Sequence, residues 1–245
     1  MHTHTRGGPL AALVASALAL ATACTAGPSG EETKNTAPST QQSAASSLPT
    51  PPPAVATAPM PAGQRQAAML SQADLPAEWH KRAPGAGRSA LPVSDPVCQP
   101  LVSLLEDMLW GPEASVGAWF QHGRGEARIS TRVTAYTGTG ARDHVIRITG
   151  AVDGCPAFTT SLRGTKVNVS TSRLPTPAFG AGSETFRLSA GRQGGPLFLQ
   201  ADVIALHRGA AVLSFQYTPS DPSGHERFEP LAKLAANKFI QATHS

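Results

Sequence analysis

The chain contains only three cysteines, Cys24, Cys98 and Cys155, and they lie in regions of different composition. Cys24 follows an apolar stretch near the N-terminus, whereas Cys98 and Cys155 lie in the part of the chain where apolar and polar residues alternate. In an oxidising compartment an unpaired thiol is a liability, so an odd number of cysteines needs an explanation. If Cys24 has a separate role, the other two are free to pair, and the fold contains at most one disulfide.

Residues 1–23 have the features of a signal peptide. Residues 1–8 are polar and carry one firm positive charge, Arg6, and an apolar run of 12 residues follows at 9–20. A run of this length is too short to span a bilayer as a helix, which takes about 20 residues, but it suits the core of a signal peptide. We therefore expect the protein to be exported.

The segment Ala21-Thr22-Ala23-Cys24 allows two interpretations of its processing. Signal peptidase I accepts Ala-x-Ala and could cut after Ala23, which would leave a secreted protein with a spare thiol. Alternatively, the segment resembles a bacterial lipobox, in which Cys24 receives diacylglycerol and becomes the first residue, although Ala21 stands where Leu is usual. Because lipidation would account for the odd thiol, we favour a lipoprotein held on the extracytoplasmic face of the cell membrane by a diacylglyceryl anchor.

Residues 24–61 read as the lipidated cysteine and a disordered tether. From Thr25 onwards this segment is mostly Pro, Ser, Thr, Ala and Gln and has almost no large apolar residue. Such a composition cannot bury enough apolar surface to offset the entropy of ordering the chain. A flexible coil of 37 residues has a mean span of roughly 30–35 Å, and its prolines would extend that reach. The tether is expected to hold a folded domain away from the membrane.

Residues 62–245 are expected to form one α+β domain. Apolar spacing of three and four residues predicts helices over 64–72, from Asp95-Pro96 to Gly111-Pro112, over 141–154 and over 226–242. Alternating or apolar segments predict strands over 115–121, 127–137, 158–162, 165–171, 184–189, 196–207 and 210–218. Because the hairpins are consecutive, we expect a twisted antiparallel sheet of about six strands with helices packed on one face and one disulfide.

Cys98 lies near the start of one predicted helix and Cys155 just after another, so a bond between them would tie the two helices together. It would close a loop of 57 residues and stabilise the fold by about 4 kcal/mol in the chain-entropy model. The alternative is a zinc site, which would need two further ligands, and no histidine lies at metal spacing near either cysteine. We favour the disulfide and expect no metal and no cofactor.

The order of several short motifs resembles the PknH-type extracellular sensor domain found in actinobacterial receptor kinases and lipoproteins. The motifs are Leu70-x-x-x-Asp74-Leu75-Pro76-x-x-Trp79, Cys98 early in a helix, and Val152-Asp153-Gly154-Cys155-Pro156-Ala157-Phe158. The resemblance covers roughly residues 64–243. It implies a sheet with helices on one side, a bond between Cys98 and Cys155, and a cleft for an unidentified ligand. The sensor domain of the kinase has a second disulfide, for which this chain lacks the cysteines.

The sequence contains no catalytic signature. The motifs Gly-x-Ser-x-Gly, His-Glu-x-x-His and a phosphate loop are missing, so we expect a protein that is not an enzyme. The histidines at 80, 122, 144, 207 and 225 are scattered and are interpreted as surface residues. The acidic pairs Asp74 with Glu78 and Glu106 with Asp107 are interpreted as solvated carboxylates.

The aromatic residues Trp79, Trp110, Trp119 and Phe120 are the candidate ligand-binding residues. They fall near predicted loops or strand edges, and an aromatic-lined cleft suits a hydrophobic or sugar-like ligand. Packing in the core is the other explanation. The net charge of +4 without a dense Lys/Arg run does not indicate a nucleic-acid partner.

Three functions remain open from the sequence. A non-enzymatic ligand-binding or sensor domain with an unknown small-molecule or envelope ligand is the leading hypothesis. A lipid or glycolipid carrier predicts an apolar cavity of order 1,000 Å³. A hydrolase of unrecognised type predicts a nucleophile and a base within about 3 Å of each other.

Overall fold

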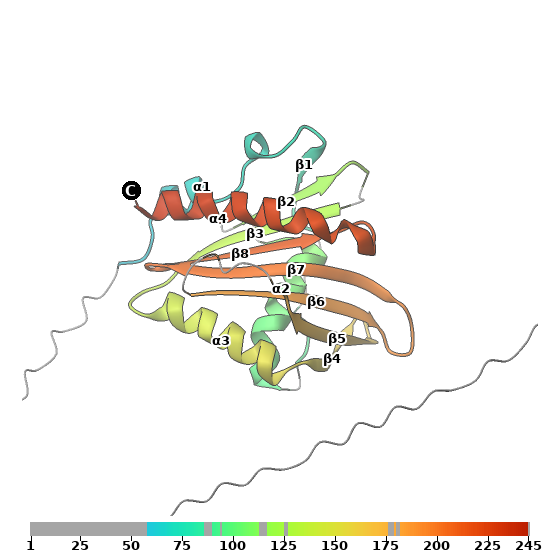
Figure 1. Ribbon diagram of the computed structural model, residues 1–245. Helices are drawn as coiled ribbons and strands as arrows, with labels where there is room; N and C mark the ends of the chain where they lie inside the picture. The colour runs from blue at the N-terminus through green and yellow to red at the C-terminus, as the bar shows by residue number, and fades with distance from the viewer. Residues whose placement is uncertain are drawn as a thin grey trace, which may run out of the picture. The chain divides into compact units, whose positions relative to one another are not determined.

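The computed structural model describes residues 58–85, 90–93, 95–112, 117–124, 127–175, 179 and 182–244. The signal peptide, Cys24 and nearly all of the tether lie outside the described residues. Within the described ranges, eight strands form a single antiparallel sheet, and four α-helices accompany it (Figure 1). The α+β class is therefore confirmed, whereas the expected number of about six strands is wrong.

The sheet has the strand order β1-β2-β3-β8-β7-β6-β5-β4. The strands are β1 (Trp79–Arg82), β2 (Gly117–His122), β3 (Ala127–Ala135), β4 (Ala157–Leu162), β5 (Thr165–Arg173), β6 (Ser183–Arg192), β7 (Leu197–Arg208) and β8 (Ala211–Thr218). After β3 the chain crosses through α3 (Gly140–Gly154) to the far edge at β4, and consecutive antiparallel strands then return until β8 pairs with β3. The strand missing from the sequence prediction is β1, which is short and mostly polar.

Helices cover both faces of the sheet, so the expectation of helices on one face is wrong. Figure 1 shows α2 (Gln99–Trp110) and α3 on one side and α4 (Phe228–His244) on the other, with α1 (Ala62–Ala68) beside α4. Strand β7 explains this arrangement because its side chains alternate between two apolar cores. Val203 and Ala205 pack in the core that contains α2 and α3, whereas Ile204 and Leu206 pack in the core that contains α4. A strand that is apolar on both faces needs cover on both.

Cys98 and Cys155 form the expected disulfide, with their Cα atoms 5.8 Å apart. Cys98 ends a 3-10 turn, η2 (Pro96–Cys98), that leads into α2, and Cys155 directly follows α3. Asp95 caps this turn, because its carboxylate accepts a hydrogen bond of 2.9 Å from the backbone of Val97. The bond joins the two helices of one face, and the zinc interpretation is wrong because both sulfurs are used in the disulfide.

Asp74 connects the N-terminal motif to the C-terminal helix. Its carboxylate accepts hydrogen bonds from the backbone and side chain of Ser71, both at 2.6 Å, and forms an ion pair with Lys238 of α4. Burial alone would raise the pKa of Asp74, but the hydrogen bonds from Lys238 and Ser71 outweigh it and lower the pKa. The side chain of Asp74 is 24% exposed, so this carboxylate is partly solvated and also links two elements.

Candidate functional site

Two of the four candidate aromatic residues belong to the core under α1 and α4. Phe120 of β2 is fully buried there, and Trp79 of β1 is buried nearby. The ring of Trp79 lies 5.3 Å from that of His122 and 6.5 Å from that of Tyr217. These contacts assign Trp79 to packing at the edge of the sheet.

The other two aromatic residues lie on the opposite face of the sheet. Trp119 precedes Phe120 in β2, so its side chain points the other way and packs against Gly111. A Cβ atom on Gly111 would lie 2.8 Å from the indole ring, and the φ of 76° at this residue also favours glycine. Trp110, the last residue of α2, lines a cavity. The four aromatic residues therefore do not form one cleft.

The cavity next to Trp110 has a volume of about 570 Å³, within the usual range for small-molecule sites. It lies between the end of α2 and the hairpins β4–β5 and β6–β7. We call it the Trp110 cavity, and it is lined by Leu109, Trp110, Leu162, Arg163, Thr165, Val167, Arg192, Pro196 and Phe198. Its lining is apolar apart from one threonine and two arginines. Sequence reasoning found Trp110 but missed the hairpin residues, which become neighbours of α2 only in the folded chain.

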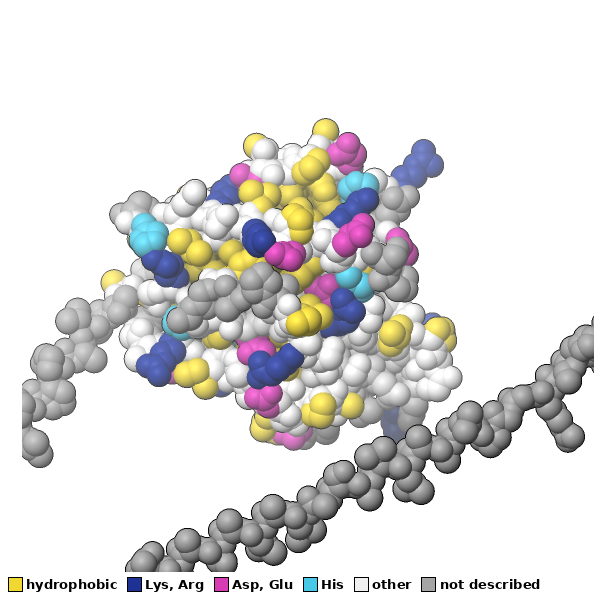
Figure 2. All heavy atoms as spheres, in the orientation of Figure 1, with side chains coloured by type: hydrophobic (Ala, Val, Ile, Leu, Met, Phe, Trp, Pro, Cys, Tyr) yellow, Lys and Arg dark blue, Asp and Glu magenta, His cyan; other side chains and the backbone are white. Residues whose placement is uncertain are grey.

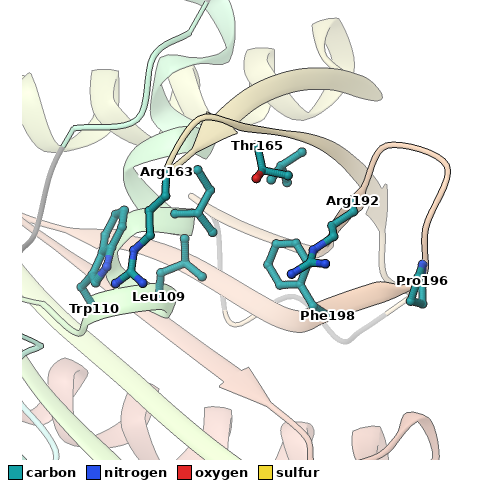
Figure 3. A pocket seen from close by; sticks show the side chains of 9 residues that line it. Leu109, Trp110, Arg163, Thr165, Arg192, Pro196 and Phe198 are labelled. Carbon is teal, nitrogen blue, oxygen red and sulfur yellow. The ribbon is translucent and has the colours of Figure 1, made fainter.

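The two arginines stand apart at the Trp110 cavity. Figure 3 shows Arg163 at the end where Trp110 lies, and Arg192 at the end where Phe198 and Pro196 lie. Phe198 is 43% exposed although it is a large apolar residue. Among the described lining residues there is no carboxylate, so the cavity is positively charged around an apolar centre.

Arg163 lies in an unusual backbone conformation. Its φ of 52° is in the left-handed region, and Gly164 follows with a φ of 77°. Two successive residues with positive φ close the two-residue hairpin between β4 and β5, which usually has Asn-Gly or Gly-Gly at this point. The arginine therefore has a backbone cost that a smaller turn residue would reduce.

A second pocket lies on the other flank of α2. We call it the Asp107 pocket; it has a volume of about 310 Å³ and is lined by Gln99, Pro100, Ser103, Leu104, Asp107, Arg132, Thr134, Tyr136, His144, Arg147 and Ser214. Asp107 is only 2% exposed and accepts a hydrogen bond of 2.6 Å from Arg132. The interpretation of Asp107 as solvated is therefore wrong. Its neighbour Glu106 accepts a hydrogen bond of 2.7 Å from the backbone of Leu91 and also has a structural role.

Aromatic rings form one wall of the Asp107 pocket. The rings of Tyr136 and His144 lie 5.3 Å apart at an angle of 31°. Burial, together with the charges of Arg147 and Arg132, lowers the pKa of His144, so its ring is neutral at neutral pH. Burial also raises the pKa of Tyr136, although the same two arginines oppose this. His144 is thus half-buried and is not the plain surface residue expected from the sequence.

His225 is the second histidine that departs from the surface interpretation. Its Nδ1 lies 2.6 Å from the carboxylate of Asp202, and its Nε2 lies 2.8 Å from Oε1 of Gln200. Asp202 is buried in β7 and also accepts hydrogen bonds from Arg187 at 2.7 and 3.1 Å. These groups hold the 3-10 segment η3 (Pro222–Arg227) on the sheet, and they line neither of the two cavities above.

Charges of both signs are interspersed on the surface that includes α4, as Figure 2 shows.

Among the described residues, no group of three or more His, Cys, Asp or Glu side chains is arranged to hold a metal ion. No helix within the described ranges combines the length and apolar character needed to cross a membrane.

The described residues form an α+β domain built on an open antiparallel sheet with helices on both faces. No family model and no curated protein matches the chain. Among solved structures, the extracellular domain of PknH from Mycobacterium tuberculosis is similar, with a TM-score of 0.54, 12% sequence identity and coverage of 77% of this chain and 100% of that one. Cyanobacterial PsbP (CyanoP) from Synechocystis sp. PCC 6803 has a TM-score of 0.31 at 10% identity over 69% of this chain and 87% of its own.

The likeness to the PknH domain shows that the chain shares the fold of an extracellular domain. It agrees with the PknH-type fold that the sequence motifs implied, except that helices cover both faces of the sheet. At 12% identity it shows the fold and nothing about a ligand.

Proposed function

We propose that this chain is a non-enzymatic, extracytoplasmic ligand-binding domain of the sensor type, carried by a lipoprotein anchored through Cys24. Its ligand is a small amphipathic anion bound in the Trp110 cavity. The observation that carries this proposal is the cavity itself, in which an apolar centre is flanked by two arginines and no described acidic residue.

The extracytoplasmic location is supported by the disulfide and by the fold. Disulfides persist in oxidising compartments and are rare in the cytosol, and the Cys98–Cys155 bond joins α2 to α3. The fold is that of an extracellular domain in PknH. The signal peptide and tether predicted from the sequence agree with both.

The lining of the Trp110 cavity determines the chemistry of its ligand. Leu109, Trp110 and Phe198 offer apolar surface, which favours an alkyl or aromatic body. Arg163 and Arg192 make no ion pair with any described residue, so their guanidinium groups are available to an anionic group such as a carboxylate. A neutral or cationic ligand would leave both charges without a partner.

The volume of the cavity favours a binding domain over a lipid carrier. A carrier that encloses acyl chains predicts a cavity of order 1,000 Å³, and the Trp110 cavity holds about 570 Å³. The hydrolase hypothesis has no catalytic motif in its support.

The proposal is tested by calorimetric titration of the purified full chain with decanoate, decanol and decyltrimethylammonium. We expect decanoate to bind at least roughly tenfold more tightly than the other two, because it alone combines an apolar body with an anion. The double variant Arg163→Gln/Arg192→Gln should lose this preference.

The matched control is Arg124→Gln, which removes an exposed arginine outside the cavity and should leave decanoate binding unchanged. Equal affinity for decanoate and decanol would overturn the anion assignment. Decanoate binding that survives both Arg163→Gln/Arg192→Gln and Trp110→Ala would show that this cavity is not the site.

A further inference from the structure

The Asp107 pocket differs from the Trp110 cavity in both position and chemistry. The two share no lining residue, and they lie on different flanks of α2. The Asp107 pocket is formed where α2 and α3 meet β3 and β8 on the face that the disulfide braces. Its volume of about 310 Å³ is at the lower end of the range for ligand sites and suits a molecule of about one sugar ring.

A buried ion pair fixes one side of this pocket. Asp107 holds the guanidinium group of Arg132, so the charge of each is already matched. The Nε atom of Arg132 is buried and makes no hydrogen bond in the described part of the chain. The Arg132 side chain is 27% exposed and lines the pocket, although its Nε atom is shielded from it.

Polar side chains surround this ion pair. Gln99 and Ser103 come from α2, Thr134 from β3, and Ser214 from β8. None of the hydroxyl groups of Ser103, Thr134 and Ser214 donates or accepts a hydrogen bond with another described residue. Three such groups facing one pocket form a surface that is complementary to a polyhydroxylated ligand.

Arg147 supplies the unmatched charge of the pocket. It lies on α3, is exposed, and has no carboxylate partner among the described residues. The pocket thus contains two guanidinium groups and one carboxylate, with His144 neutral beside them. The excess of one positive charge matches a single anionic group, and a guanidinium binds a carboxylate through two parallel hydrogen bonds.

We propose that the Asp107 pocket is a second ligand site, specific for a hydroxylated monocarboxylate of about one sugar ring, of the uronic acid type. Arg147 binds the carboxylate of the ligand. The hydroxyl groups of Ser103, Thr134 and Ser214 bind its oxygen atoms. The rings of Tyr136 and His144 form the wall against which the carbon face of the sugar packs.

The experiment is a calorimetric titration of the purified full chain with D-glucuronate and with D-glucose. We expect glucuronate to bind and glucose, which lacks the carboxylate, to bind at least roughly tenfold more weakly. Arg147→Gln should weaken glucuronate binding by about the same factor and leave glucose binding unchanged. Ser103→Ala should weaken the binding of both sugars severalfold.

Arg142→Gln is the matched control, because Arg142 is an exposed arginine of the same helix that does not line the pocket. It should bind glucuronate like the unmodified chain, and so should the double variant Arg163→Gln/Arg192→Gln. Because Arg163→Gln/Arg192→Gln alters the Trp110 cavity and no residue that lines the Asp107 pocket, glucuronate binding by this variant tests the Asp107 pocket independently of the proposed function. Absence of glucuronate binding, or equal loss of binding in Arg147→Gln and Arg142→Gln, would overturn the proposal.

Discussion

At the scale of single residues, Arg163 combines a backbone cost with a place at the Trp110 cavity. Its φ of 52° suits asparagine better than arginine, and the following Gly164 completes the preferred Asn-Gly turn. We expect Arg163→Asn to raise the free energy of unfolding by about 0.5–1 kcal/mol while it weakens decanoate binding. Urea denaturation and calorimetry measure the two effects. Arg163→Gln should weaken binding without the gain in stability, and a gain of the same size in that variant would show that the turn is not the cause.

His144 is the residue whose titration should affect stability. Burial and the charges of Arg147 and Arg132 lower its pKa in the folded chain below the value of about 6.5 expected in the unfolded chain. As the pH falls below about 6.5, the unfolded chain binds a proton that the folded chain does not, so stability decreases. We expect His144→Gln to lose less stability than the unmodified chain between pH 7 and 5 in urea denaturation. The exposed His80, changed to Gln, is the control, and an identical pH profile for His144→Gln would contradict this account.

At the scale of elements, the network of Asp202 holds η3 to β6 and β7. Asp202 is 2% exposed and binds both Arg187 and His225. Asp202→Ala would leave two partly buried partners without their buried carboxylate, and we expect a loss of about 3 kcal/mol in the free energy of unfolding. Asp153→Ala is the comparison, because Asp153 is 62% exposed in its pair with Arg173 and should cost less than about 1 kcal/mol. Urea denaturation of both variants checks the difference, and similar losses would show that burial does not govern these pairs.

The elements also show what the sequence could predict and where it failed. Helices and strands with clear periodicity, such as α3 and the β4–β5 hairpin around Arg163-Gly164, were found close to their observed bounds. The second covered face was missed because apolar runs such as that of β7 have no period that separates one buried face from two. The cavities were missed because their lining residues come from α2 and from hairpins or strands far along the chain. Asp107 and Arg132 are 25 residues apart, and no local pattern pairs them.

The disulfide acts between α2, which lines both cavities, and α3, which lines the Asp107 pocket. It closes a loop of 57 residues, for which the chain-entropy model gives about 4 kcal/mol. We expect Cys98→Ser/Cys155→Ser to lower the urea midpoint accordingly and to make stability insensitive to dithiothreitol. If dithiothreitol destabilises this double variant as much as it does the parent, the effect of the reductant does not arise from this bond.

At the scale of the whole molecule, the proposed anchor and the disulfide together account for all three thiols. If Cys24 is lipidated and Cys98 is bonded to Cys155, the mature chain has no free sulfhydryl group. We expect the protein, expressed in a bacterial host and fed an alkyne fatty acid, to be labelled, and Cys24→Ala to be unlabelled and to leave the membrane fraction. Maleimide should react with the denatured chain only after reduction. Labelling of Cys24→Ala at the parent level would refute the lipid anchor at Cys24. Reaction of denatured, unreduced Cys24→Ala with maleimide would instead refute the disulfide, because only Cys98 and Cys155 remain in that variant. The two experiments therefore test the anchor and the disulfide independently.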